Sequence, residues 1–199
     1  MDTLSPSTPY ARLTPEEKER FFGVWSTDLT PAERALQGQT EGYCRLGSLI
    51  HAYVMQRSLL FKAATLPTTV ARRQKRECFA NATWLALDNE GTYAYVEGYA
   101  FSTVGLVTSH AWCVTQEGEV IDPTWDSPEC CAYLGIPFNL DFLIAQMNET
   151  GVYGVFGEMP SIDLLSSPVH KMVHPWFRAQ IEARPQWPEL TRALRTAEA

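Results

Sequence analysis

The residues of this chain that could do chemistry together are a cysteine, a histidine and an aspartate, in that order along the sequence. Cys78 lies in "KRECFANATW", His110 in "SHAWCVT" and Asp122 in "EVIDPTW". A carboxylate that fixes one imidazole nitrogen leaves the other free to take a proton from a nucleophile. The basic cluster "RRQKR" at 72–76 precedes the cysteine, and nearby cations favour the thiolate, which is the form that attacks. These residues predict a nucleophilic cysteine site if the fold brings them into one pocket.

Whether His110 and Asp122 share a face depends on the turn that joins their two apolar runs. A two-residue loop at 117–118 would send His110 to the opposite face, because a register shift of one residue exchanges the two faces of a strand. A three-residue loop at 116–118 would place Trp112 opposite Asp122 and make His110 its diagonal neighbour on one face. The third loop residue is glycine, which favours this second loop, since a type I turn followed by a left-handed residue is a common connection of that length. We therefore expect the imidazole and the carboxylate to meet.

At these residues the chain resembles the transglutaminase-like branch of the papain-like cysteine enzymes. The "HAW" and "DPTW" blocks that contain His110 and Asp122 are similar to the histidine and aspartate blocks of that family, and the resemblance covers about residues 70 to 126. It implies a papain-like topology with the cysteine at a helix start, the histidine on a following strand and the aspartate on the next. It also implies that Cys78 is the nucleophile that forms a thioester, that His110 is the general base and then the acid, and that Asp122 orients the imidazole. The implied substrate is a peptide, a protein or a small amide, and the implied cofactor is none.

The N-terminal part of the chain is predicted to form helices that cover a sheet. Two segments open with a threonine N-cap, a proline at the first helical position and a glutamate at the third, which is typical of helix starts. A third segment has apolar residues at helical spacing before Pro67, and a fourth ends at the turn signal Asn89–Gly91. The four segments are LTPEEKERFFGVW, DLTPAERALQGQ, residues 43–64 and residues 68–91.

The start of the helix around Cys78 decides how far that residue is activated. If the helix begins near Thr69, Cys78 lies in mid-helix, away from the N-terminal dipole, which acts only within the first turn. If the helix begins at Cys78, the dipole favours the thiolate and the backbone amide of Cys78 can stabilise an oxyanion. Gln74 is a second oxyanion candidate by residue type, and Asn81 would lie beside Cys78 on a helix and offer a polar contact near the sulfur. The basic cluster is otherwise interpreted as a solvated helix face.

Beyond residue 91 the pattern changes from helical to strand-like. "TYAYVEGYAF" alternates strictly between large and small side chains, as a strand does. We therefore expect an α+β fold in which N-terminal helices pack on an antiparallel sheet. The predicted strands are 92–101, 106–115 and 119–125, and two C-terminal helices are predicted at 176–184 and 188–197. The predicted organisation is a flexible tail at 1–13 and one domain at 14–199, with a helical part at 14–90, a sheet-rich part at 92–126 and mixed loops and helices at 127–199.

Three other residues have two interpretations each. Glu97 lies among tyrosines in mid-strand, where an unpaired charge is costly. It is either paired with an arginine or bonded to tyrosine hydroxyls, or it lines the cleft as a substrate-binding acid. Trp112 and Trp125 either wall the cleft or pack in the core.

Composition excludes several classes of protein. The net charge of −7 and a pI of about 5.1 disfavour a nucleic-acid or anionic-membrane partner. No apolar run approaches the roughly 20 residues of a membrane span, and "MDTLSPSTPY" lacks the regions of a signal peptide. The odd number of cysteines, five, indicates reduced thiols rather than a disulfide framework. We expect a cytoplasmic protein in which Cys44, Cys130 and Cys131 are structural.

A zinc site is a weak interpretation of the same segment. His110 and Cys113 form H-x-x-C, but a C-x-x-C pair is absent, and the expected register sends these two residues to opposite faces. His170 and His174 are spaced i, i+4 without the glutamate of H-E-x-x-H and are predicted to be surface residues.

Two alternatives stay open at the level of function. Attack on the thioester by water would make the protein a hydrolase, whereas attack by an amine would make it an acyltransferase. The other class is a non-enzymatic binding or inhibitor protein on the same fold, in which Cys78 is an inert core thiol, since cysteine is among the most often buried residues.

Overall fold

A computed structural model describes residues 14–16, 23–25, 27–45, 49–156 and 167–184 of the chain. The tail predicted at 1–13, most of the first predicted helix and the helix predicted at 188–197 lie outside these residues. The helices are α2 (Pro31–Arg45), α3 (Leu49–Arg57), α4 (Cys78–Asp88), α5 (Leu140–Thr150), α7 (Val169–Met172) and α8 (Arg178–Glu182), with 3-10 turns at Pro128–Cys130 and Pro175–Phe177. The strands are β1 (Leu59–Phe61), β2 (Ala94–Phe101), β3 (Val107–Val114), β4 (Val120–Ile121) and β5 (Ala132–Phe138).

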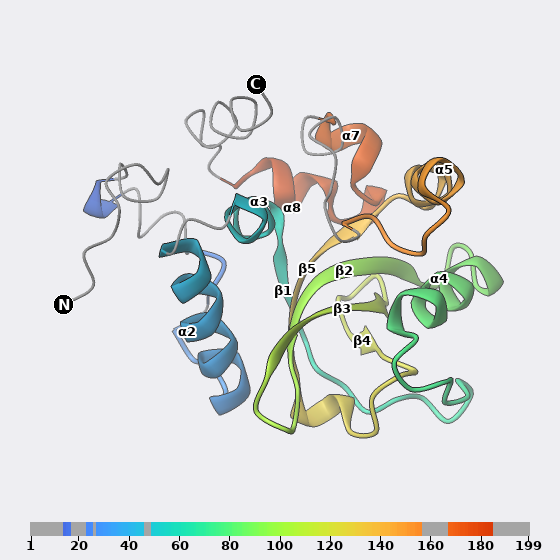
Figure 1. Cartoon of the computed structure of the whole chain (residues 1–199), viewed down its shortest axis with the longest axis horizontal. Helices are drawn as coiled ribbons and strands as arrows, with labels where there is room; N and C mark the ends of the chain where they lie inside the picture. The colour runs from blue at the N-terminus through green and yellow to red at the C-terminus, as the bar shows by residue number, and fades with distance from the viewer. Residues whose placement is uncertain (1–13, 17–22, 26, 46–48, 157–166, 185–199) are drawn as a thin grey trace.

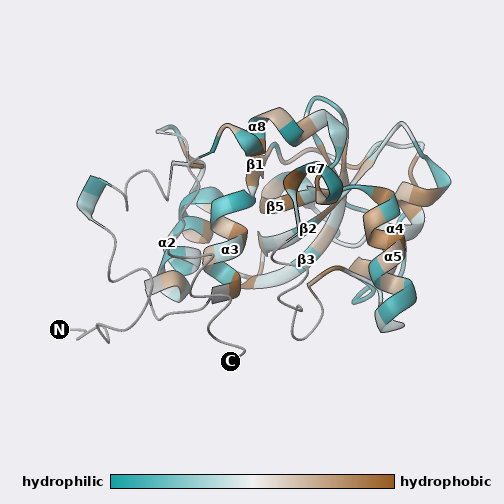
Figure 2. Ribbon diagram, turned by 90° about the horizontal axis from the view of Figure 1, so that it is seen from above, coloured by the Kyte–Doolittle hydropathy of each residue, from teal (hydrophilic) through white to brown (hydrophobic). Residues whose placement is uncertain are grey.

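These strands form one curled antiparallel sheet in the order β1-β5-β2-β3-β4, so that β2 lies at its centre (Figure 1). The expected α+β architecture, with helices packed on an antiparallel sheet, is confirmed. Figure 2 shows α2 and α3 at one end of the sheet and α4 and α5 at the other.

Each face of the sheet carries its own apolar core. On one face, Tyr95, Tyr99 and Cys113 pack with buried residues of α2, α3, α4 and α5. On the other face, Trp112 and Tyr133 pack with Phe61 and Phe177. The alternation predicted for β2 explains the division, because successive side chains of a strand point to opposite faces. His110 is two residues from Trp112 and therefore belongs to the second face.

The N-terminal helices differ from their predicted bounds. The helix start at Thr30 is confirmed as a capping box, because the Thr30 backbone N–H donates to Glu33 Oε2 (2.7 Å) and the Glu33 backbone N–H donates to Thr30 Oγ1 (3.2 Å). The single helix predicted at 43–64 is wrong. Residue 43 still belongs to α2, α3 ends at Arg57, and the apolar run Leu59–Phe61 forms strand β1. A short apolar run has no periodicity that separates a buried strand from a helix.

Strand β5 was also not predicted, and it lies in the segment predicted as mixed loops and helices. All seven of its residues are buried, so the hydrophobic alternation of a half-exposed strand is absent. It also contains Gly135 and Pro137, which are uncommon in strand interiors. The Pro137 carbonyl accepts from the His174 backbone N–H (2.8 Å) and so points away from β2. The missing N–H of Pro137 therefore removes no bond from the β2–β5 ladder.

Arg184, the last described residue, closes the C-terminal end of α3. Its guanidinium donates to the backbone carbonyls of Met55 (3.0 Å), Gln56 (3.1 Å) and Ser58 (2.9 Å). Carbonyls at a helix end have no intrahelical partner, and this side chain supplies one for them. Among the residues that the structure describes, no helix has the length and apolar character needed to cross a membrane.

Candidate active site

The β3–β4 hairpin has the three-residue loop expected from the sequence. Val114 pairs with Val120, and the Thr115 backbone N–H donates to the Glu119 carbonyl (3.0 Å). Gly118 closes the loop with φ +81°, a left-handed conformation that favours glycine. Continuing this register places residue 122 opposite residue 112, and His110 Nε2 lies 2.8 Å from Asp122 Oδ2. The predicted contact between the imidazole and the carboxylate is confirmed.

Asp122 is fully buried and its carboxylate is held on both oxygens. Oδ1 accepts from the backbone N–H groups of Thr124 (2.8 Å) and Trp125 (3.3 Å), and Oδ2 accepts from the Tyr133 hydroxyl (3.0 Å). Burial raises the pKa of this carboxyl, but the hydrogen bond and charge of His110, with the other donors, outweigh burial and lower the pKa. Asp122 therefore stays ionised at neutral pH and acts as a fixed counter-charge.

His110 is 1% exposed and lies in the wall of a cleft. Its ring stacks on Trp125, with 4.0 Å between ring centroids and 16° between planes. Burial lowers the pKa of His110, but the hydrogen bond and charge of Asp122, with a contribution from Cys78, raise it to about 9. The imidazole is consequently protonated at neutral pH. With Nε2 engaged by Asp122, Nδ1 is the nitrogen left for a second partner.

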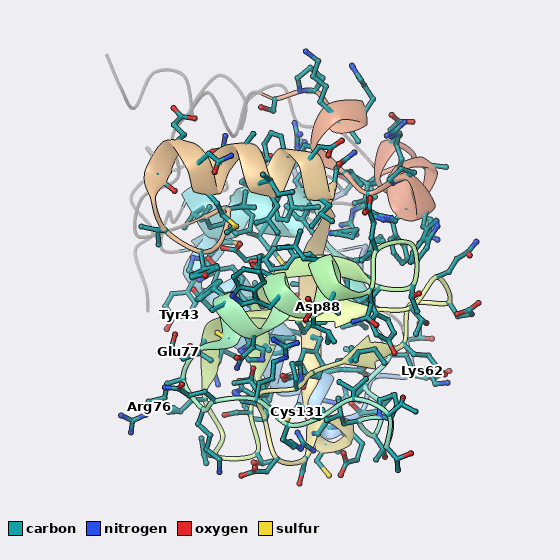
Figure 3. All side chains as sticks on the ribbon, turned by 90° about the vertical axis from the view of Figure 1, so that its right-hand side faces the viewer. Tyr43, Lys62, Arg76, Glu77, Asp88 and Cys131 are labelled. Atoms are coloured by element: carbon teal, nitrogen blue, oxygen red, sulfur yellow. The ribbon has the colours of Figure 1, made fainter. Side chains whose placement is uncertain are left out.

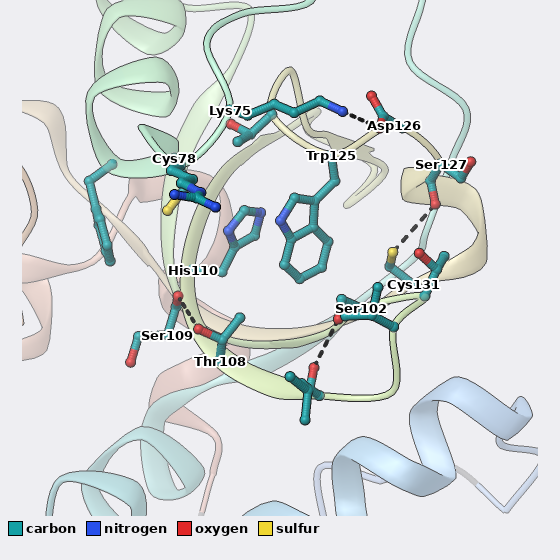
Figure 4. Close-up of a pocket in the computed structure, with 16 residues that line it drawn as sticks. Lys75, Cys78, Ser102, Thr108, Ser109, His110, Trp125, Asp126, Ser127 and Cys131 are labelled. Atoms are coloured by element: carbon teal, nitrogen blue, oxygen red, sulfur yellow. Dashed lines mark hydrogen bonds and ion pairs between the residues drawn. The ribbon is translucent and has the colours of Figure 1, made fainter.

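Cys78 is the first residue of α4 and lines the same cleft as His110 (Figure 4). The helix predicted over 68–91 therefore starts at its later alternative, because residues 68–77 form turns and coil. The thiol lies at the positive end of an 11-residue helix, a position that favours a thiolate. Cys78 as a whole is 9% exposed. A small part of the residue is accessible from the cleft, and the rest is covered by the protein.

A strained turn makes this helix start possible without glycine. Arg76 has φ +71° and, among the described residues, is the one non-glycine residue with positive φ. An L-residue in this conformation costs about 1–2 kcal/mol. Figure 3 shows Arg76 and Glu77 at the surface of the molecule. The left-handed turn at Arg76 redirects the chain immediately before Cys78, where the sequence offers neither glycine nor proline.

The basic cluster is part of this loop rather than of a helix face, which corrects the sequence interpretation. Arg72 donates to the carbonyls of Asp122 (3.4 Å) and Asp126 (2.7 Å), and Lys75 pairs with the Asp126 carboxylate (2.6 Å). Arg73 pairs with Asp88 (3.0 Å). The contacts of Arg72 and Lys75 fasten the loop before Cys78 to the segment that follows β4, and the contact of Arg73 fastens it to the end of α4.

The two polar side chains expected near the sulfur, Gln74 and Asn81, have other positions or partners. The Asn81 amide donates to the Gln74 carbonyl (2.7 Å) and to Thr124 Oγ1 (3.0 Å), so both of its N–H groups are engaged. Gln74 is exposed and is not among the residues that line the cleft. Asn81 instead joins α4 to the "DPTW" segment through Thr124, and so helps to fix the position of Cys78 relative to Asp122.

The cleft has a volume of about 620 Å³. Trp125 lines it, as one interpretation had expected, whereas Trp112 is fully buried in the core and does not. The tip of the β2–β3 hairpin forms part of the opposite wall through Val104 and Leu106, which are 79% and 64% exposed. The sequence placed Leu106 at the start of the predicted strand 106–115 and Val104 in the loop before it, and neither position suggested a cleft wall.

Cys131 also lines the cleft, but its thiol differs from that of Cys78. It donates to the Ser127 carbonyl (3.3 Å), and burial raises its pKa to about 11. Cys44, Cys113 and Cys131 are buried, Cys130 is exposed, and all four are free thiols like Cys78. The expectation of a structural role therefore fits Cys44 and Cys131, while the exposed position of Cys130 gives no sign of one.

Glu97 has the tyrosine partner that one interpretation expected. The Tyr95 hydroxyl donates to its carboxylate (2.9 Å), as do the backbone N–H groups of Val155 (2.6 Å) and Phe156 (2.9 Å). It lines a second cavity, not the cleft that contains Cys78. His174, expected at the surface, is half-buried and accepts from the Trp176 backbone N–H (3.4 Å), whereas His170 is exposed.

His110 and Cys113 point to opposite sides of β3, since Cys113 belongs to the helix-covered core. Within the described part of the chain, no three histidine, cysteine or acidic residues are grouped in a way that could hold a metal ion. No protein-family model, curated protein or solved structure matches this chain.

Proposed function

We propose that this protein is a cysteine-dependent hydrolase or acyltransferase that acts on an amide or related acyl bond through a thioester on Cys78. The observation that carries the proposal is the imidazole of His110, which Asp122 holds at 2.8 Å in the wall of the cleft that Cys78 lines. A cation beside a thiol at a helix N-terminus favours the thiolate. A plain structural core has no need of this arrangement.

In the first half of the reaction, the Cys78 thiolate attacks the acyl carbon and forms a C–S bond. His110 gives the proton on Nδ1 to the leaving nitrogen, the C–N bond breaks and the amine leaves. In the second half, water or an acceptor amine attacks the thioester carbon while His110 takes its proton. The C–S bond then breaks and the acid or the new amide is released.

The backbone N–H of Cys78 is the proposed oxyanion donor. The first residues of a helix have no intrahelical acceptor for their N–H groups, and α4 begins at the nucleophile itself. A donor on the attacking residue lies close to the carbonyl oxygen of a bound substrate, where it stabilises the developing negative charge.

The same features support a papain-like, transglutaminase-like topology as a proposal. A cysteine at a helix start, a histidine on β3 and an aspartate after β4 follow the order that the resemblance implies. The proposed substrate is a peptide, a protein or a small amide, and the proposed location is cytoplasmic, where free thiols are the rule.

The test is the rate at which iodoacetamide alkylates each cysteine between pH 5 and 9, followed by mass spectrometry of peptides. Exposed Cys130 serves as the internal reference. We expect Cys78 to react at least 10-fold faster than Cys130 at pH 6, because Cys78 begins helix α4 and shares its cleft with His110, a setting typical of reactive cysteines. His110→Ala should abolish this advantage, and His170→Ala, at an exposed histidine, should not. A Cys78 that reacts no faster than Cys130 at any pH would favour the non-enzymatic binding protein.

A further inference from the structure

A second cavity, of about 370 Å³, lies beside the cleft that contains Cys78. Both share Phe79, Thr108 and Ser109 as lining residues. A substrate bound across Cys78 would therefore place one part in the cleft and another part in the second cavity. The second cavity is further lined by Tyr43, His51, Glu97, Tyr99 and Phe156.

Three packed rings, Tyr43, His51 and Tyr99, from three elements line this second cavity. Tyr43 of α2 lies 4.5 Å from His51 of α3 between ring centroids, and His51 stacks on Tyr99 of β2 at 4.2 Å and 6°. Burial lowers the pKa of His51 to about 4, so this imidazole is neutral at physiological pH. Tyr43 is 43% exposed and lies at the same edge of the molecule as Glu77 in Figure 3.

Glu97 supplies a carboxylate to the same cavity. It is 2% exposed, and within the described residues its carboxylate accepts from the Tyr95 hydroxyl and from the backbone N–H groups of Val155 and Phe156. In the described parts of the chain, no lysine, arginine or histidine nitrogen lies within 4.0 Å of it. A buried carboxylate without a cation is costly. Burial accordingly raises the pKa of Glu97 to about 7 despite its three donors.

We propose that the second cavity binds a positively charged amino group of the substrate, next to the bond that Cys78 attacks. Ammonium ions are attracted to the faces of aromatic rings, and Glu97 provides the counter-charge that a buried cation requires. The site needs no movement of a charged residue, because its carboxylate is already fixed by the 151–156 segment. As a subsite beside Cys78, this assignment rests on the proposed function, but the binding of a cation in the cavity does not.

The test is direct binding of two small probes of similar shape, n-butylammonium and the uncharged n-butanol. Binding is measured by chemical-shift titration of the full chain carrying Cys78→Ala, at pH 8, where Glu97 is ionised. We expect n-butylammonium to bind at least 10-fold more tightly than n-butanol, with shifts at the amides of Tyr99 and Ser109. Adding Glu97→Gln should reduce the preference to about twofold. The matched control is Glu90→Gln, at a glutamate that lines a different cavity, and should leave the preference unchanged.

A second pair of variants keeps the proposal testable if Glu97→Gln unfolds the 151–156 segment. Tyr43→Leu removes the outermost ring without touching the core and should weaken n-butylammonium binding several-fold, whereas Tyr43→Phe should preserve it. Equal affinity for the two probes, or an ammonium preference that survives both Glu97→Gln and Tyr43→Leu, overturns the proposal. An unreactive Cys78 together with intact ammonium binding would refute the enzyme assignment and leave the cation site standing.

Discussion

Gly98 lies directly opposite His110 in the β2–β3 ladder and directly opposite Gly135 in the β2–β5 ladder. A side chain at position 98 would run into the backbone of β5, where the Leu134 carbonyl and the Gly135 Cα leave no room for a Cβ atom. β2 and β5 approach each other closely at these glycines, and β2 pairs on its other side with β3, which carries the histidine.

Gly98→Ala should therefore destabilise the fold strongly, because backbone atoms cannot move aside as the end of a flexible side chain can. We expect a loss of at least about 3 kcal/mol in the free energy of unfolding, measured with urea. The control is Gly38→Ala on α2, where a Cβ meets nothing within 4 Å, and which should raise stability by about 0.5–1 kcal/mol. Equal stability of Gly98→Ala and the unmodified protein would contradict the close strand contact.

Asp122→Asn keeps the shape of the side chain and removes the charge that holds the imidazolium. The pKa of His110 should fall, since burial then acts against the charged ring with less compensation. We expect alkylation of Cys78 at pH 6 to slow at least 10-fold, and amide turnover to drop by about 10³-fold or more. Asp126→Asn, in the same loop but exposed and paired with Lys75, should change the alkylation rate less than twofold. Equal rates of Cys78 alkylation in the two variants would contradict the role that we assign to the Asp122 charge.

The raised pKa of His110 also makes stability depend on pH in a defined direction. The folded protein holds this proton more tightly than the unfolded chain, so the contribution is complete below the unfolded pKa of 6.5 and is lost as pH rises through about 9. The difference corresponds to about 3 kcal/mol. Urea unfolding under reducing conditions should show stability falling between pH 6.5 and 9.5, and His110→Gln should flatten this interval. If the stability of His110→Gln fell equally steeply over this interval, the pH dependence would come from other titratable groups.

Arg76→Gly should stabilise the protein, because glycine adopts positive φ without the steric cost that arginine bears. The expected gain in the free energy of unfolding is about 0.5–1 kcal/mol after the entropy of the unfolded glycine is subtracted. Ala71→Gly, in the same exposed loop but not at positive φ, should instead lower stability. A loss of stability in Arg76→Gly as large as that in Ala71→Gly would show that the turn carries no strain.

The sequence was most informative where local chemistry determines geometry. Gly118 at the third loop position was enough to predict the register of β3 and β4, and with it the contact between His110 and Asp122. The capping box at Thr30 was predicted for the same reason, since the partners are three residues apart.

Prediction failed where distant segments decide the structure. β1 is a three-residue edge strand too short to show a period, and β5 is buried throughout and shows no alternation. The Tyr133 hydroxyl that holds Asp122 belongs to β5. The start of α4 stayed ambiguous because residues 68–77 favour a helix by composition. Their coil is stabilised by contacts of Arg72, Arg73 and Lys75 with residues more than ten positions away.

The hydrogen bonds from Arg184 to the C-terminal end of α3 limit how far the protein can be shortened for experiments. A fragment that stopped at the end of α8 would keep every catalytic candidate yet leave three carbonyls at Met55, Gln56 and Ser58 without their guanidinium. Protease trimming or recombinant production of a minimal version should therefore retain residue 184, although it lies far from Cys78 in the sequence.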